Sequence, residues 1–169
     1  MKKFVLVSIA LLVLGACAST MRPTATATLG STSGSTATGT VTFTEMADGS
    51  VQAVIHLTGV PPGIHGFHLH DKGDCGDNGN AAGGHFNPTG APHGAPSAAS
   101  HHAGDFGNVE AGADGMVNET RTLHGVTVTA GANSVVGHAV ILHANPDDLT
   151  TQPSGNAGPR IACGLVQMK

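Results

Sequence analysis

Apolar and polar residues alternate with a period of two along the chain from Gly39 onward. In the first run, Val41 and Phe43 are flanked by threonines, and the alternation continues over residues 51–57. Such alternation is typical of strands with one buried face. Asp48-Gly49 lies between the two runs, and this dipeptide favours a tight hairpin turn. The pattern therefore predicts a strand, a turn and a second strand.

Further β-rich runs follow in the second half of the chain. Asp114-Gly115 separates Phe106–Val109 from Met116–Thr129, and two later runs cover Ser134–His143 and Arg160–Val166. No stretch has the 3.6-residue period of an amphipathic helix. We expect an all-β protein, an antiparallel sandwich or barrel of about eight strands.

The segment between His70 and Asp105 is dense in glycine, proline, asparagine and histidine. Structureless loops of such length are uncommon inside compact domains, so something must order this one. The sequence offers two candidates, a disulfide through Cys75 and a bound metal.

The N-terminus has the features of an export signal. Met1-Lys2-Lys3 is basic, and the apolar run Phe4–Leu14 is too short to span a hydrocarbon core of roughly 30 Å. Residues 1–16 are therefore expected to be a signal peptide. Leu14-Gly15-Ala16-Cys17 resembles the lipobox of bacterial lipoproteins, which implies that Cys17 carries a lipid anchor. The alternative is an ordinary exported protein with an incidental cysteine.

Residues 17–38 are rich in threonine, serine, alanine and glycine, and we expect them to form a flexible tether after the lipidated cysteine. Residues 39–169 then form one domain, in a chain of 169 residues. Without Lys2 and Lys3, five basic residues face eleven acidic ones, a net charge of −6. This charge argues against a nucleic-acid partner.

The chain has three cysteines. If Cys17 is lipidated, Cys75 and Cys163 remain as a pair in an exported protein, where disulfides form and persist. We therefore predict a Cys75–Cys163 bridge. Thiolate metal ligands are a weaker alternative because no CxxC spacing is present.

Histidine is abundant, with 11 residues, and several occupy positions suited to metal binding. In the segment GFHLH, strand alternation places His68 and His70 on the face opposite their apolar neighbours. His143 projects in the same way from a later apolar strand. Three further histidines and an aspartate lie along the long loop: His85, His93, His102 and Asp105.

The chain resembles the Cu,Zn superoxide dismutases in five motifs over roughly residues 39–169. These motifs are GFHLH, AGGHFNP, HAGDFGN, HANPDDL and GNAGPRIACG. Cys75 follows His70 by five residues, as in bacterial members. The resemblance implies an eight-stranded Greek-key barrel with long metal-binding loops.

The resemblance also implies one copper and one zinc per subunit. The implied copper ligands are His68, His70, His85 and His143, and the implied zinc ligands are His85, His93, His102 and Asp105, so that His85 bridges the two metals. Imidazoles suit copper, and a closed zinc site is redox-silent. Asp147 matches the carboxylate that orients one histidine from each metal site, here His68 and His93. The five remaining histidines are expected to be surface or packing residues: His56, His65, His101, His124 and His138.

The implied activity is dismutation of superoxide to O2 and H2O2 by a copper redox cycle, in which His85 takes up and releases a proton. Arg160 corresponds to the arginine that guides the anion to the copper site, and Lys72 is a second candidate for steering. The segment from Asp148 to Arg160 is short and lacks the acidic and lysine side chains of the longer electrostatic loop of eukaryotic members, so guidance by those charges is not expected.

Export and the lipid on Cys17 imply a membrane-anchored protein of the cell envelope, periplasmic or on the outer surface, that protects the envelope from superoxide. Its assembly is left open between a monomer and a homodimer. Two other functions are weighed against this one, a metal-binding module without activity and a hydrolytic zinc enzyme. The complete ligand set argues against the first, and the lack of an HExxH or comparable pairing argues against the second.

Overall fold

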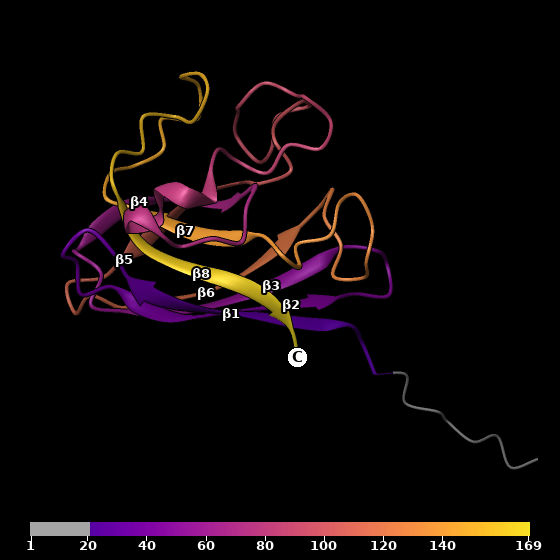
Figure 1. The fold of residues 1–169 in the computed structure, drawn as a ribbon, viewed down its shortest axis with the longest axis horizontal. Coiled ribbons are helices and arrows are strands. Elements are labelled where there is room, and N and C mark those ends of the chain that lie inside the picture. The colour runs from indigo at the N-terminus through magenta and orange to yellow at the C-terminus, as the bar shows by residue number, and fades with distance from the viewer. Residues whose placement is uncertain (1–20) are drawn as a thin grey trace, which may run out of the picture.

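The computed structural model describes residues 21–169, which form a nearly closed antiparallel barrel (Figure 1). The strands follow the order β5-β4-β7-β8-β1-β2-β3-β6. Their bounds are β1 (Thr24–Ser31), β2 (Thr38–Glu45), β3 (Val51–Thr58), β4 (Gly63–His70), β5 (Asp105–Ala111), β6 (Val117–Leu123), β7 (Ala139–His143) and β8 (Arg160–Met168). The predicted eight-stranded all-β fold and the two Asp-Gly turns are confirmed. The apolar runs around β6 and β7 had predicted longer strands than the structure has.

The core forms from the alternating apolar positions because every second side chain of a strand points inward. Phe43 in β2, Ile55 in β3 and Phe67 in β4 are fully buried. β4 and β7 differ from the other strands because both of their faces are buried at most positions. Their inner face packs into the barrel, and their outer face lies under the long loop.

The tether predicted over residues 17–38 is wrong for the part that the structure describes. Thr24–Ser31 forms β1, which pairs with β2 and with β8. Ala25, Ala27 and Leu29 point inward, and their relative exposures are 0%, 0% and 2%. The domain therefore begins by Thr24 rather than at residue 39. The predicted signal peptide 1–16 and the lipidated Cys17 lie outside the described residues.

The small side chains of β1 explain why its sequence does not predict a strand. Its alternating alanines and threonines bury little apolar surface per residue, which suggested a tether. The strand gains order by supplying backbone hydrogen bonds to both β2 and β8, whose facing edges would otherwise be unpaired.

The barrel is sealed between β5 and β6, which stand at the two ends of the strand order. Arg121 on β6 donates through Nη1 to the carbonyl of Phe106, at 2.8 Å, and its other terminal nitrogen donates to the carbonyl of Asn108. Glu119 pairs with the same guanidinium.

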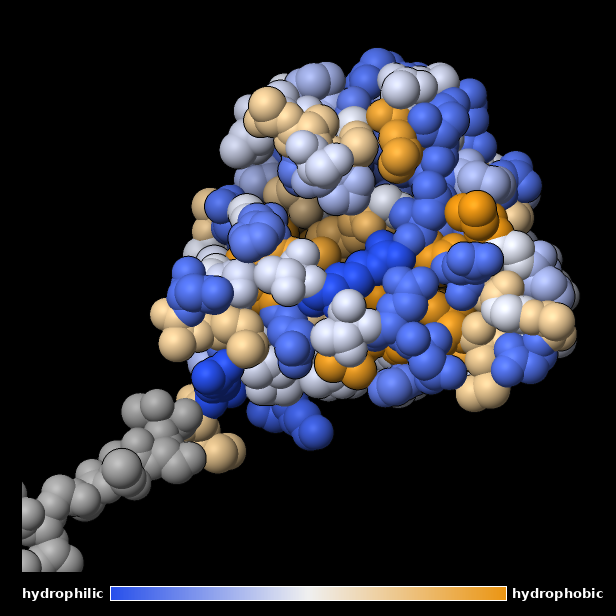
Figure 2. All heavy atoms as spheres, turned by 180° about the vertical axis from the view of Figure 1, so that it is seen from behind, coloured by the Kyte–Doolittle hydropathy of each residue, from blue (hydrophilic) through white to orange (hydrophobic). Residues whose placement is uncertain are grey.

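On the side of the molecule opposite to that in Figure 1, a narrow band of strongly hydrophilic residues runs between apolar ones (Figure 2).

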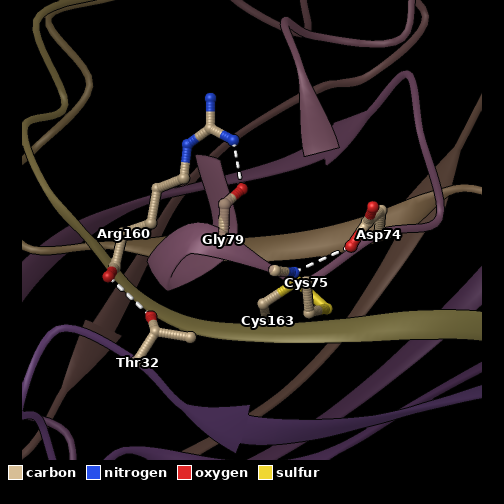
Figure 3. Close-up of a disulfide and its surroundings, with 7 residues drawn as sticks. Thr32, Asp74, Cys75, Gly79, Arg160 and Cys163 are labelled. Atoms are coloured by element: carbon tan, nitrogen blue, oxygen red, sulfur yellow. Dashed lines mark hydrogen bonds between the residues drawn. A yellow bond between two sulfur atoms is a disulfide. The ribbon is translucent and has the colours of Figure 1, made fainter. Parts of the chain in front are cut away.

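The long loop after β4 contains a short 3-10 helix, η1 (Asp77–Ala82), the only helix within residues 21–169. No helix in that part of the chain is long and apolar enough to cross a membrane. The predicted disulfide is confirmed, since Cys75 in the loop is bonded to Cys163 on β8 (Figure 3). Ala82 of η1 packs with Ile141 on the outer face of β7, beside the disulfide. The bridge therefore ties the loop to the barrel wall.

Candidate metal centre

Two groups of ligand-type side chains meet where the long loop covers β4 and β7. His68 and His70 project from the outer face of β4, and His143 ends β7. His70 also forms an isolated β-bridge with His85, which fixes the loop against the strand. Strand alternation thus places three histidines on one wall, and the loop brings the fourth to them.

In the first group, one ligand atom of each residue lies within 4.8 Å of every other. The members are His68, His70, His85 and His143, and all are buried. In the second group the same distance limit holds, and its buried members are His85, His93, His102 and Asp105. His85 belongs to both groups.

Hydrogen bonds to the outer ring nitrogens orient the first group. Nδ1 of His70 donates to the carbonyl of Gly83 at 2.9 Å, and Nδ1 of His143 donates to that of Gly158 at 3.1 Å. The two Nε2 atoms then face each other at 3.3 Å. Nε2 of His68 donates to Oδ2 of Asp147 at 2.8 Å, which turns its Nδ1 toward the group. Each ring therefore presents a lone pair inward.

The second group converges on one oxygen of Asp105. Oδ1 lies 2.7 Å from Nδ1 of His85, 2.9 Å from Nδ1 of His93 and 3.2 Å from Nδ1 of His102. Oδ2 accepts the backbone amides of Gly94 and His102 at 3.0 and 2.8 Å. The backbone bonds fix the carboxylate so that its other oxygen faces the three rings.

Three ring nitrogens are buried without a hydrogen bond among the described residues: His68 Nδ1, His85 Nε2 and His102 Nδ1. The last of these lies 3.2 Å from Oδ1 of Asp105, but the contact lacks hydrogen-bond geometry. A buried polar atom without a partner costs free energy, and each of these atoms points into one of the two groups. Cations at the two centres would supply the missing partners. Four imidazoles suit copper, and three imidazoles with a carboxylate suit a closed zinc site, so the residues fit one copper and one zinc.

Burial keeps three histidines of the first group neutral, and metal binding requires neutral imidazoles. Burial lowers the pKa of His68 to about 4 and that of His143 to about 3, and it holds the pKa of His70 well below its ordinary value. Burial alone would raise the pKa of Asp105, but hydrogen bonds from His85, from the Gly94 amide and from other donors outweigh it and lower the pKa. Three rings of the first group are therefore neutral, and the carboxylate of the second group is ionised.

Asp147 joins the two groups. Its Oδ2 accepts from His68, and its Oδ1 accepts from Nε2 of His93 at 3.0 Å. The side chain of Asn108 holds the backbone of Asp147 from both sides, because Oδ1 accepts the amide at 2.7 Å and Nδ2 donates to the carbonyl at 2.9 Å. Sequence reasoning missed Asn108, although it closes the HAGDFGN motif.

Arg160 opens β8 and pairs with His143 in the sheet. Its guanidinium donates to the carbonyls of Gly79 and Gly83, and the bond to Gly83 is 2.6 Å long. Figure 3 shows the Gly79 contact beside the disulfide. Gly83 also accepts from His70, so the cation shares a carbonyl with a member of the first group. The side-chain carbons of exposed Lys72 pass near the same glycine.

The five histidines expected to be surface or packing residues stand outside both groups. Buried His65 contacts the carbonyl oxygens of His143 and Pro61, at 2.9 and 2.7 Å. His101 bonds to the carbonyl of its neighbour, and His102 is the one that enters the second group.

Residues 37–166 match the family model described as copper/zinc superoxide dismutase (SODC). The chain is also similar to a crystal structure of the clock protein EA4, at 36% sequence identity and a TM-score of 0.78. That match covers 86% of this chain and 94% of the other.

Proposed function

Because the chain belongs to the copper/zinc superoxide dismutase family, it is a superoxide dismutase, and we propose a role for each residue of its two ligand groups. His68, His70, His85 and His143 would hold copper, and His85, His93, His102 and Asp105 would hold zinc. The position of His85 between the two groups is the observation that carries this assignment. Its Nδ1 faces the second group and its partnerless Nε2 faces the first, as a bridging imidazole requires.

When bound, copper supplies the one-electron redox chemistry that converts one superoxide to O2 and another to H2O2, while zinc adds a redox-silent charge. Forming H2O2 also takes two protons, which come from water directly or through a side chain. Asp105 fixes Nδ1 of His85 at 2.7 Å, which leaves Nε2 as the ring atom placed to carry one of these protons. Asp147 holds His68 and His93 through Nε2, so that Nδ1 of each ring points into its ligand group.

Arg160 attracts the anionic substrate. The whole chain has a formal net charge of −4, so attraction of superoxide needs a local positive field. The carbonyls of Gly79 and Gly83 hold the guanidinium in place beside the copper group. A half-buried cation is screened less by solvent than a surface lysine, which favours Arg160 over Lys72 as the main guide.

The test compares the protein loaded with copper and zinc against the protein loaded with zinc alone. We expect superoxide consumption only with copper. No activity with both metals bound would leave a metal-binding module as the better description.

The role of Arg160 has its own test. We expect Arg160→Gln to lower turnover roughly tenfold and to flatten its dependence on salt, because steering contributes at least that much to association with a small anion. Arg22→Gln is the matched control, since Arg22 is exposed two residues before β1 begins and donates to the sulfur of Met46. Metal content and the copper spectrum should stay unchanged in both variants. Unchanged turnover in Arg160→Gln would remove this residue from the mechanism.

The enzyme works outside the cytoplasm in this proposal, as a lipoprotein of the cell envelope that removes superoxide there. The leader and lipobox-like residues before Cys17 support this location, and so does the disulfide, which persists in oxidising compartments. Labelling with a radioactive fatty acid tests it in a bacterial host. Label should enter the wild-type chain but not Cys17→Ala, and an unlabelled wild-type chain would refute the anchor.

A further inference from the structure

The segment after β7 reaches back over the zinc group through one exposed side chain, that of Gln152. Its Nε2 donates to the carbonyl of His93 at 2.8 Å, and its Oε1 accepts the amide of His93 at 2.8 Å. One carboxamide therefore closes a ring of two hydrogen bonds with the backbone of a residue 59 positions away.

The backbone of His93 is held by these two side-chain hydrogen bonds, whereas the backbones of the other members of the second group are held by strands or by backbone hydrogen bonds. Asp105 lies in β5, His85 is bridged to β4, and His102 accepts the backbone amide of Asp105 at 3.1 Å. His93 lies in an irregular stretch of the loop. Within residues 21–169, its backbone amide and carbonyl bond only to Gln152.

The same segment also holds the ring of His93. Oδ1 of Asp147 accepts from Nε2, while Nδ1 faces Asp105. Asp147 and Gln152 are five residues apart, and Oδ1 of Asp147 also accepts the amide of Leu149 at 2.7 Å between them. The segment after β7 therefore forms hydrogen bonds with both the backbone and the imidazole of His93.

We propose that Gln152 is a positioning residue for the zinc site, which fixes the backbone of His93 so that its Nδ1 lies within reach of the metal. This inference rests on the proposed assignment of His93 as a zinc ligand. Without the carboxamide, the ring contacts of His93 and the bond from the Gly94 amide to Asp105 remain. The amide and carbonyl of His93 itself lose their partner, so zinc is held less tightly. Copper is affected less, because three of its ligands lie on strands.

The experiment uses the full-length protein with copper bound and either zinc or Co(II) in the second group. Gln152→Leu removes both hydrogen bonds at similar size, and Gln152→Glu keeps the acceptor and loses the donor. Gln167→Leu is the control, since Gln167 is exposed on β8, far along the barrel from the metal centre. Zinc release to a chromogenic chelator and the visible spectrum of Co(II) are measured for each protein.

We expect Gln152→Leu to release zinc about tenfold faster than wild type, because loss of a partner behind a ligand typically costs at least that factor in metal affinity. The Co(II) bands should shift, since they report the ligand geometry, and Gln152→Glu should fall between wild type and Gln152→Leu. Gln167→Leu should match wild type in both measurements.

Two outcomes would overturn the proposal and are distinguishable. If wild type binds zinc and Co(II) while Gln152→Leu behaves like Gln167→Leu, Gln152 has no positioning role and the zinc assignment stands. If wild type binds neither ion at the second group, the assignment itself fails, and this inference fails with it. Should Gln152→Leu not fold, Gln152→Glu decides, and a wild-type release rate and spectrum in that variant would refute the proposal.

Discussion

Gly155 lies where the segment after β7 turns over the contact between Asp147 and His93. Its φ is +67°, a left-handed conformation. A Cβ added there would stand 1.8 Å from Oδ1 of Asp147 and 2.7 Å from Nε2 of His93. Ordinary van der Waals contact begins at 3.4 Å, so the carboxylate must move by more than an ångström. After such a move Oδ1 no longer reaches His93.

The cost of Gly155→Ala has two parts. Alanine in a left-handed conformation costs about 1 to 2 kcal/mol. Losing a buried hydrogen bond to a charged group costs a further ~1.5 to 3 kcal/mol. We therefore expect the free energy of unfolding of the metal-free protein to fall by about 2.5 to 5 kcal/mol.

Gly125 provides the control. Its φ is +75°, and nothing lies within 4 Å of the position of an added Cβ. Gly125→Ala thus carries the backbone penalty alone and should cost about 1 to 2 kcal/mol.

Urea unfolding of both metal-free variants, followed by circular dichroism, measures the difference. Zinc binding in competition with a chelator gives a second reading, and only Gly155→Ala should bind zinc more weakly. Equal losses of stability in the two variants, with wild-type zinc affinity in both, would refute the reasoning that Gly155 is required by the Asp147–His93 contact.

Other predictions concern the fold as a whole. Replacing Cys75 and Cys163 together by serine opens a loop with a sequence separation of 88, and urea unfolding should show a loss of about 4 to 5 kcal/mol by loop-entropy arguments; a loss below about 1 kcal/mol would contradict them. The pKa of His68 is about 4 in the folded chain against 6.5 when exposed, so the unfolded chain takes up the proton first, and metal-free protein should lose stability as pH falls through this window; a urea midpoint that stays constant there would argue against neutral burial. Ala27→Asp places a charge inside the barrel and should cost several kcal/mol, whereas Thr28→Asp on the exposed face should cost little; equal thermal stability of the two variants would return this segment to a tether.

Periodicity was sufficient for the strands with large inward side chains. Phe43, Ile55 and Phe67 each stand at an alternating apolar position, and each is fully buried. β1 has the same period with Ala25 and Ala27, but alanine gains little from burial, so its place depends on hydrogen bonds to neighbours that are distant in sequence. Long-range pairing of this kind leaves no local signal.

Some residues of the candidate site can also be predicted from the sequence, and others cannot. Ligand-type side chains have recognisable chemistry, and the predicted members of both groups are brought together. Asn108 and Gln152 have ordinary side chains that act on the backbone of Asp147 and His93. Most amide side chains lie on the solvated surface, so only the three-dimensional contact identifies these two.

The two metal groups differ in what makes them rigid. Three members of the first group stand on β4 and β7, where core packing on the opposite face of each strand fixes them. The second group draws His93 and His102 from a loop with little core of its own, which is held by the disulfide, by Asp105 and by side-chain bonds to its backbone. Segments with few buried apolar contacts open at lower free energy than the core they cover. Loss of zinc should therefore release the loop while the barrel persists, and the first group then loses His85, its only member from the loop. Zinc can in this way control the geometry at copper although it takes no part in electron transfer.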